Sequence, residues 1–196
     1  MRVIGLTGKT GAGKSTVAAF LKEKGCFIID GDKIAREILL PGEPAVKELA
    51  DCFGEDIILT DGNIDRKKLA ARAFADAEST DKLNRITHPR ITERFIKERD
   101  SAEKDGYSIA VIDAAALLES DCKKLCSFFI VVTAPEEIRL ERILSRDGIT
   151  KEQALTRIKA QKSDEYYFSQ ADYIVKNYPP YSLDDELEKL AKELEL

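Results

Sequence analysis

One short stretch near the N-terminus restricts the fold more than any other part of this chain. Gly8–Ser15 has the pattern G-x-x-x-x-G-K-[ST] and lies between an apolar run, Arg2–Gly8, and a helical segment that begins at Lys14. The glycines in such a loop let successive backbone N–H groups face phosphate oxygens, and the helix N-terminus adds its positive end. A strand, a phosphate-binding loop and a helix in this order predict an α/β domain that binds a nucleoside triphosphate.

Four further apolar runs predict the other strands of a sheet. They lie at Cys26–Asp30, Tyr107–Ala115, Cys126–Ala134 and Asp172–Asn177. Helical segments separate them, and the last segment, Ser182–Leu196, has Ser182 in the position of an N-cap. Since strands that alternate with helices form parallel sheets covered on both faces, the sequence predicts this architecture.

The second predicted strand is followed by a long helical insertion. Residues 32–104 are charged and contain amphipathic segments such as "DKIAREILL" and "DRKKLAARAFA". In a parallel sheet, ligands bind beyond the carboxyl ends of the strands. We therefore expect the phosphate-binding loop, Asp30 and Asp32 after the second strand, and Asp113 after the third to come to one edge.

Composition makes several classes of protein improbable. The net charge is −5, with 31 Lys and Arg among 36 acids, so we expect no general nucleic-acid surface. No apolar run reaches the roughly 20 residues of a membrane span, and the N-terminus runs straight into the loop, so we expect a cytoplasmic protein. The spacing of Cys122 and Cys126 fits either half of a metal site or reduced thiols. We favour thiols because His88 is the one histidine available.

Lys14, Ser15 and Asp32 have residue types suited to phosphoryl transfer. In this motif the lysine reaches the β- and γ-phosphates, and the hydroxyl of the next residue ligates Mg²⁺. The Asp32 carboxylate has two candidate roles. It either orients an attacking alcohol and takes its proton, or caps the helix that follows. The spacing does not decide between them.

Four arginines lie between the last two predicted strands: Arg139, Arg142, Arg146 and Arg157. Arg142 and Arg146 are i,i+4 neighbours and share a helical face. Guanidinium groups suit the oxygens of a transferring phosphoryl group. A solvated face paired with nearby glutamates is the more usual role of such a charge run, so both interpretations stay open.

Proteins with this loop differ in their other motifs. Asp51–Gly54 matches the GTPase pattern D-x-x-G, but it lies in a predicted helix and no NKxD partner follows. No signature of a transporter-type ATPase is present. The short chain, the helical insertion and the arginine-rich segment favour a small-molecule kinase, whose site must close to keep water from the phosphoryl group.

Several motifs follow one another along almost the whole chain. They are "GLTGKTGAGKSTVA", "DGDKIAR" at Asp30–Arg36, "LNRITHPRI", "RIKAQ" and "ADYIVKN". In this combination the chain resembles the dephospho-coenzyme A kinase family, whose motifs include "GLTGGIGSGKSTVA" and "D-A-D-x-I-A-R/H" and come in the same order. The loop alone is unspecific, whereas this ordered combination is highly specific.

The resemblance implies a P-loop kinase fold in three parts. These are a nucleotide-binding core at 1–31, 106–135 and 168–196, a helical acceptor-binding domain at 32–105, and a helical lid at 136–167. It implies transfer of the ATP γ-phosphate, with Mg²⁺, to the ribose 3′-hydroxyl of dephospho-coenzyme A. That reaction is the last step of coenzyme A synthesis.

The resemblance also implies roles for single residues. The catalytic groups are Asp32, which takes the place of the family's carboxylate, Lys14 and Arg142. The expected contacts to ATP are Gly11, Ala12, Gly13, Lys14, Ser15, Thr16, Arg142, Arg146 and Asn177, with Arg157 a further candidate and Ser15 the metal ligand. The expected contacts to the acceptor are Thr7, Asp32, His88 and Leu117, although a lone histidine before a proline is more often structural.

Two stretches depart from the family's pattern. Lys9 replaces a frequent glycine, so we expect the backbone there to need no glycine-only conformation. Asp113–Glu119, "DAAALLE", lacks the proline and the aromatic residue of the family's "D-x-P-L-L-F/Y-E". Asp113 either binds the Mg²⁺ shell through water or caps its strand.

Two other functions remain as alternatives. A nucleoside monophosphate kinase would show a stretch like "DGFPR", which is absent. A nucleotide-dependent switch would need no acceptor-facing carboxylate, so its ATP turnover would survive the loss of Asp32.

Overall fold

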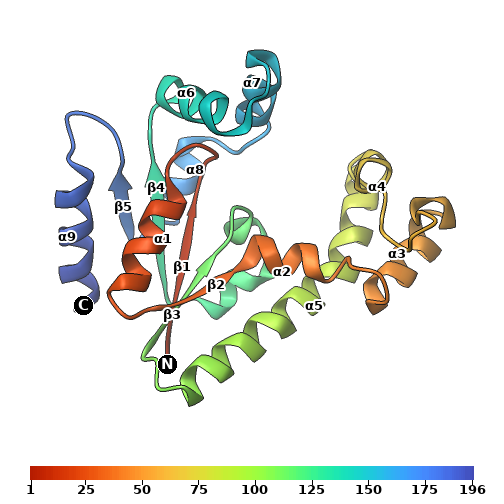
Figure 1. Cartoon of the computed structure of the whole chain (residues 1–196), viewed down its shortest axis with the longest axis horizontal. Helices are drawn as coiled ribbons and strands as arrows, with labels where there is room; N and C mark the ends of the chain where they lie inside the picture. Colours follow the sequence, from red (N-terminus) through yellow and green to blue (C-terminus); the bar gives the residue numbers. More distant parts are fainter. The chain divides into compact units, whose positions relative to one another are not determined.

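The computed structural model describes all 196 residues, and its central element is a sheet with the strand order β2-β3-β1-β4-β5 (Figure 1). The strands are β1 (Arg2–Gly8), β2 (Phe27–Asp30), β3 (Ile109–Asp113), β4 (Phe128–Thr133) and β5 (Tyr173–Lys176). β1 pairs in parallel with β3 and with β4, and β4 pairs in parallel with β5. Each predicted apolar run contains one of these strands, and the predicted α/β class is confirmed.

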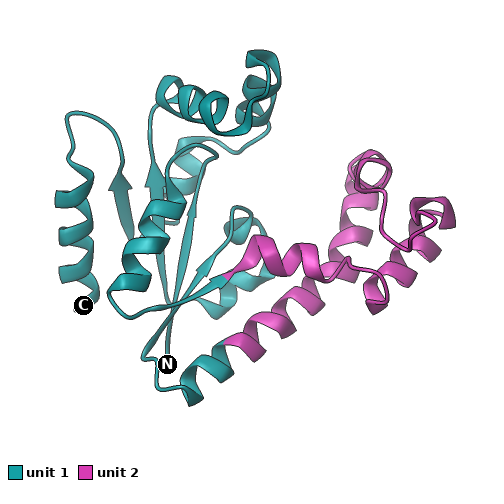
Figure 2. Ribbon diagram, in the orientation of Figure 1, with its two compact units in different colours: residues 1–29, 99–196 teal, residues 30–98 magenta.

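The chain divides into two compact units, coloured separately in Figure 2. Unit 1 consists of residues 1–29 and 99–196 and contains the sheet, whereas unit 2 consists of residues 30–98 and is mainly helical. The long helix α5 (Ala77–Lys104) begins in unit 2 and ends in unit 1. The division into core, acceptor-binding domain and lid stays a prediction.

Helices cover both faces of the sheet in unit 1. Since successive strand residues point to opposite faces, the side chains of Ile130 and Val131 lie in different apolar clusters. The cluster around Ile130 includes α1 (Lys14–Glu23) and α9 (Leu183–Leu194). The cluster around Val131 includes the 3₁₀ turn η2 (Leu117–Glu119) and α8 (Asp164–Phe168). The other helical segments of this unit are η3 (Asp121–Leu125), α6 (Glu136–Asp147) and α7 (Lys151–Lys159).

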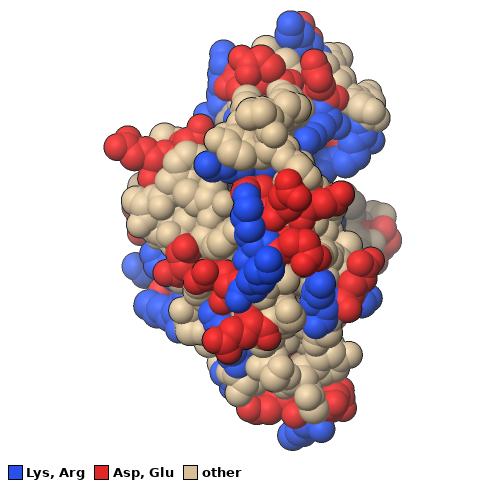
Figure 3. Space-filling model, turned by 90° about the vertical axis from the view of Figure 1, so that its left-hand side faces the viewer, with Lys and Arg blue, Asp and Glu red and all other residues tan.

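Helix α9 follows directly from its local sequence. Ser182 is the N-cap, as predicted, and its Oγ accepts a hydrogen bond from the backbone N–H of Asp185 at 3.4 Å. Leu187, Leu190 and Leu194 recur at helical spacing and are buried in the cluster that covers the sheet. Figure 3 views the molecule from the side on which α9 lies in Figure 1, and basic and acidic side chains are interspersed on that face.

Truncation of Leu190 is expected to destabilise unit 1. Leu190→Ala should lower the free energy of unfolding by about 2–5 kcal/mol, because the side chain is fully buried and its loss leaves a cavity. Urea unfolding followed by circular dichroism measures the change. Leu196→Ala is the matched control, since Leu196 is 37% exposed and its loss should change stability by no more than about 0.5 kcal/mol. Equal losses in the two variants would contradict the packing of α9 on the sheet.

Unit 2 has its own small core. Its helices are α2 (Gly31–Glu37), α3 (Pro44–Phe53), the 3₁₀ turn η1 (Glu55–Ile57), α4 (Arg66–Ala73) and most of α5. Buried apolar residues of α3, η1 and α4 form one cluster. Outside this core, Arg72 donates two hydrogen bonds to the Asp56 carboxylate, at 2.6 and 2.8 Å, and they hold the pKa of Asp56 well below its usual range.

The N-cap of α2 is Asp30 and not Asp32. Asp30 Oδ1 accepts a hydrogen bond from the backbone N–H of Lys33 at 2.8 Å. Asp32 lies within the first turn of the helix and is exposed. The capping role considered for Asp32 is therefore wrong, because the carboxylate that satisfies the helix N-terminus comes two residues earlier.

The four cysteines form no disulfide. Cys122 is buried within η3, and Cys126 lies just after it, so the two do not share an α-helical face. Burial, together with the nearby Cys122, raises the pKa of Cys126 to about 12, which keeps its thiol protonated at neutral pH. No group of three or more His, Cys, Asp or Glu side chains is arranged to hold a metal ion. None of the helices has both the length and the apolar character that crossing a bilayer requires.

Candidate active site

The phosphate-binding loop connects β1 to α1. Gly11 and Gly13 have φ of +79° and +97°, in the left-handed region that glycine adopts readily. Glu195 is the one non-glycine residue with a positive φ, so the backbone at Lys9 needs no glycine, as predicted. Of the first backbone N–H groups of α1, that of Thr16 donates to the carbonyl oxygen of Gly13 at 3.1 Å. The positive end of the helix suits a bound anion.

A close approach of Asn177 explains why residue 13 is glycine. Asn177 follows β5, is buried, and donates from Nδ2 to the carbonyl oxygen of Ala12 at 2.8 Å. A Cβ atom on Gly13 would lie 2.0 Å from that nitrogen. Asn177 therefore holds the turn of the loop from outside, and its predicted contact to the base of ATP stays a prediction.

Arg142 of α6 also binds the outer side of the loop. Its Nη1 donates to the carbonyl oxygens of Gly11 and Ala12, both at 3.3 Å, and its Nη2 donates to that of Asn177 at 2.9 Å. Because the guanidinium is a rigid planar fork, these contacts fix the loop carbonyls relative to α6 and β5. Arg142 is thus a support of the loop in this structure, and its contact to a phosphate of ATP stays a prediction.

Lys14 forms an ion pair with Asp113, the last residue of β3. The two side chains are 18% and 16% exposed, and charges that are partly buried attract each other more strongly than charges in bulk water. The structure therefore brings the lysine of the loop and the aspartate at the end of β3 together, at the sheet edge where both were expected.

Thr7 and Leu117 are buried within unit 1. Thr7 is fully buried, and its Oγ1 donates to the carbonyl oxygen of Ala115 at 3.2 Å. Leu117 is 1% exposed and lies against Gly5 of β1. Thr7 thus connects β1 to the turn after β3, and Leu117 packs this turn against β1. Their contact to the acceptor stays a prediction.

Arg146 and Arg157 share one carboxylate. Arg146 donates to both oxygens of Asp147, at 2.6 and 3.1 Å, and Arg157 donates to one of them at 2.9 Å. The hydrogen bonds from Arg146 lower the pKa of Asp147. The two guanidinium groups are about half exposed or more, so neither is buried by this arrangement.

Two predicted site residues belong to unit 2. Asp32 lies in the first turn of α2, which follows β2 directly. His88 is half-buried in α5, and the helix continues through Pro89. The roles predicted for Asp32 and His88 stay predictions.

A family model described as dephospho-CoA kinase matches residues 2–180. The chain belongs to the dephospho-CoA kinase family. A dephospho-CoA kinase of Corynebacterium glutamicum is 42% identical over 174 residues, which cover 89% of this chain and 87% of that protein. One of Listeria monocytogenes is 36% identical over 193 residues, 98% of this chain and 94% of that protein. The family and the class of enzyme predicted from the sequence are confirmed.

Solved structures agree with the fold of this dephospho-CoA kinase family member. A dephospho-CoA kinase from Campylobacter jejuni is 27% identical, with a TM-score of 0.60, over 99% of this chain and 96% of that one. A shikimate kinase from Bacteroides thetaiotaomicron, at 17% identity and a TM-score of 0.53, covers 100% of this chain and 99% of that one and shows the fold alone. The predicted P-loop kinase fold is confirmed.

Sequence reasoning missed several residues that hold the loop in this family member. Arg139, which the sequence placed only in the arginine-rich segment, is 3% exposed and donates from Nη1 to the carbonyl oxygen of Thr10 at 3.5 Å. Gln161 and Asp164 contact Thr10 and Lys9 of the loop. Gln161 and Asp164 lie far from the loop along the chain, so no local sequence pattern predicted these contacts. Gln161 ends the "RIKAQ" motif that supported the resemblance.

Substitution of Gly13 tests the shape of the loop. Gly13→Ala is expected to lower the affinity for ATP at least tenfold, because the new Cβ would meet Asn177 at 2.0 Å in addition to the cost of its left-handed backbone. Nucleotide titration by calorimetry measures the affinity. The matched control is Gly106→Ala, with φ +90° and no atom within 4 Å of the new Cβ. It shares the backbone cost and should bind ATP within about twofold of the parent protein. Equal affinity in both variants would contradict the contact with Asn177.

Proposed function

We propose that this protein transfers the γ-phosphoryl group of ATP to the ribose 3′-hydroxyl of dephospho-CoA, which yields coenzyme A and ADP. The observation that carries this proposal is the family match over residues 2–180, which includes the phosphate-binding loop together with the motifs beyond it. Membership of the family supports ATP-dependent phosphorylation of dephospho-CoA in coenzyme A synthesis.

The nucleotide phosphates are proposed to bind at the N-terminus of α1. The backbone N–H groups of Gly13, Lys14, Ser15 and Thr16 lie at this end of the helix, where N–H groups and the helix dipole favour anions. The ammonium group of Lys14 is proposed to move from the Asp113 carboxylate to the β- and γ-phosphate oxygens. Its charge there stabilises the negative charge that develops as the γ-phosphoryl group is transferred.

Mg²⁺ is the proposed metal, and the residues present fit it. Ser15 and Asp113 supply hydroxyl and carboxylate oxygens, which are the hard ligands that Mg²⁺ prefers. Mg²⁺ is usually held by one or two protein groups together with substrate phosphates. When bound, the ion would neutralise charge on the β- and γ-phosphates.

Asp32 is proposed as the general base. In this step the 3′-hydroxyl oxygen forms a bond to the γ-phosphorus, the bond from that phosphorus to the bridging oxygen breaks, and ADP leaves. The hydroxyl proton passes to the Asp32 carboxylate. Asp32 stands in the stretch Asp30–Arg36 that resembles the family's "D-A-D-x-I-A-R/H", and this position supports the proposed role.

The remaining predicted residues are proposed to bind and enclose the substrates. Residues 136–167 would act as a lid that excludes water, and its Arg142 and Arg146 would contact ATP phosphates. Residues 32–105 would bind the acceptor, with His88 as one contact. Thr7 and Leu117 would act on the acceptor side by shaping the turn after β3.

A direct assay tests the proposed reaction. The protein is incubated with Mg-ATP and dephospho-CoA, and ADP and coenzyme A are followed by mass spectrometry. We expect the two products in equal amounts and little ADP without the acceptor, because the phosphoryl group goes to the hydroxyl and not to water. Equal ADP release without the acceptor, or no coenzyme A, would contradict the proposal.

Two substitutions test the assigned roles. Asp32→Asn and Lys14→Ala are each expected to lower turnover at least tenfold, because the first removes the proton acceptor and the second removes charge from the transition state. The same coenzyme A assay measures both. Asp184→Asn, which makes the same chemical change at an exposed position in the first turn of α9, is the control and should stay within about twofold of the parent. A near-normal rate in Asp32→Asn would remove Asp32 from the base role.

A further inference from the structure

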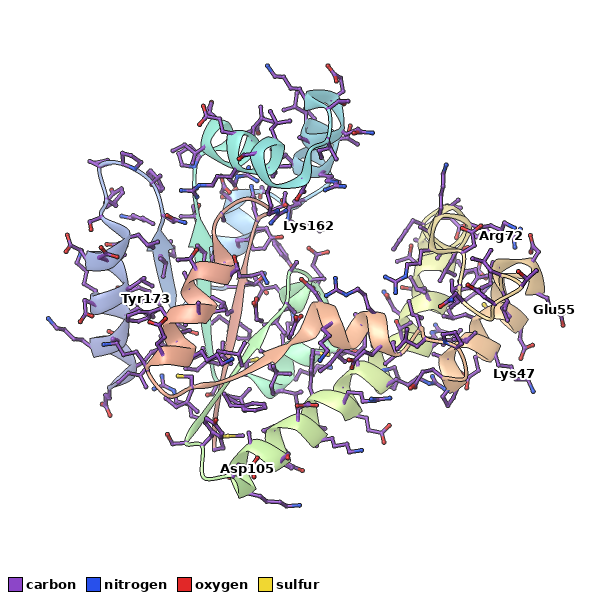
Figure 4. The ribbon with its side chains drawn as sticks, in the orientation of Figure 1. Lys47, Glu55, Arg72, Asp105, Lys162 and Tyr173 are labelled. Carbon is purple, nitrogen blue, oxygen red and sulfur yellow. The ribbon has the colours of Figure 1, made fainter.

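The segment 161–164, which ends at the first residue of α8, holds the first turn of the phosphate-binding loop. The Oδ1 atom of Asp164 lies 2.6 Å from Nζ of Lys9. The backbone N–H of Thr10 donates to Oε1 of Gln161 at 3.0 Å. Figure 4 labels Lys162, the residue after Gln161 in this segment. Two consecutive loop residues are therefore bound by one short stretch of chain.

Lys9 is unusually buried for a lysine in a loop. Its side chain is 14% exposed, while that of its partner Asp164 is 59% exposed. Lysine is rarely removed from water unless its charge is paired, and the carboxylate of Asp164 provides that pairing. The Lys9 side chain thus has a defined direction, toward the start of α8.

The backbone explains why a side chain is tolerated at this position. The φ angle of Lys9 is not positive, so a residue with a Cβ atom has no left-handed strain there. A glycine at the same position would have no group that reaches Asp164. The ion pair therefore depends on the lysine at this position.

The two halves of the loop have different partners. The N–H of Thr10 is already bound by Gln161, and that of Ala12 donates to the carbonyl oxygen of Lys9 at 3.0 Å. The proposed anion site lies later, at the start of α1, where the positive end of the helix favours an anion. The N–H groups of Thr10 and Ala12 in the first turn are therefore used within the protein.

We propose that Lys9 and Asp164 are positioning residues for ATP. Their ion pair, with the hydrogen bond from Thr10 to Gln161, fixes the first turn of the loop and thereby keeps the N–H groups at the start of α1 aligned for phosphates. This inference rests on the proposed function, since ATP is the ligand assigned to the loop. An ion pair with one exposed partner contributes modestly, so its loss corresponds to about a two- to fivefold change in affinity.

Asp164→Asn gives the sharpest test, because the two explanations for Lys9 predict opposite signs. If the ion pair positions the loop, this variant binds ATP about two- to fivefold more weakly although it has lost a negative charge. If Lys9 merely adds positive charge near the phosphates, removing Asp164 frees that charge and ATP binds more tightly. Calorimetric titration with ATP, without the acceptor, measures the dissociation constant.

A double-mutant cycle shows whether the two residues act as a pair. Lys9→Met removes the ammonium group and keeps most of the stem, and it should weaken ATP binding to a similar extent. The double variant should lose no more ATP affinity than the single variant that binds ATP less tightly, because both changes remove the same interaction. Lys9→Arg, which keeps the charge, should stay within about 1.5-fold of the parent. The KM for ATP should rise in parallel, whereas the turnover number and the KM for dephospho-CoA should stay within about 1.5-fold.

A distant ion pair provides the matched control. Lys24 lies just after α1, and its Nζ is 3.6 Å from Oε1 of Glu188 in α9. Lys24→Met and Glu188→Gln should leave ATP affinity unchanged. Thermal unfolding of each variant checks that it is folded.

The outcomes separate the two proposals. A parent protein that binds no ATP or makes no coenzyme A contradicts the proposed function. A parent that does both, with unchanged or tighter ATP binding in Asp164→Asn or with additive losses in the double variant, overturns the positioning role.

Discussion

Hydrogen bonds from Asn177 and Arg142 to the carbonyl groups of the phosphate-binding loop determine the shape of the candidate site. A loop that turns its N–H groups toward an anion turns carbonyl groups the other way, and buried carbonyl groups need donors. Ala12, whose carbonyl accepts from both side chains, is 1% exposed. Leaving such a group without a donor costs about 1–3 kcal/mol. The loop after β1 therefore depends on α6 and on the end of β5.

Charges in unit 1 follow a similar rule. Lys14 is paired with Asp113, and Lys9 with Asp164. Partly buried cations need such partners, because an unpaired charge away from water is costly. The two pairs hold the lysines of the loop in defined places. In the proposed reaction, a phosphate that binds Lys14 would compete with the Asp113 carboxylate.

The start of α2 shows how two neighbouring carboxylates are given different tasks. Asp30 caps the helix through the N–H of Lys33, so the helix begins at Gly31 and Asp32 falls in its first turn. Spacing alone left either role open for Asp32, because both aspartates precede the same helical segment. The difference depends on which backbone N–H lies within reach of which carboxylate, and that is a matter of three-dimensional geometry.

The sequence by itself determined the α/β class, the five strands, the phosphate-binding loop and the family. These features are local or ordered along the chain: β1, the loop and α1 are contiguous, and the later motifs follow in a fixed order. Only the tertiary structure decided that Asn177 meets the loop 165 residues earlier, and that Arg142 binds carbonyl groups. It also decided that Lys9 pairs with Asp164. Periodicity reports how neighbours along the chain share a face, whereas the partner of a hydrogen bond or of a charge is set by how distant strands and helices pack together.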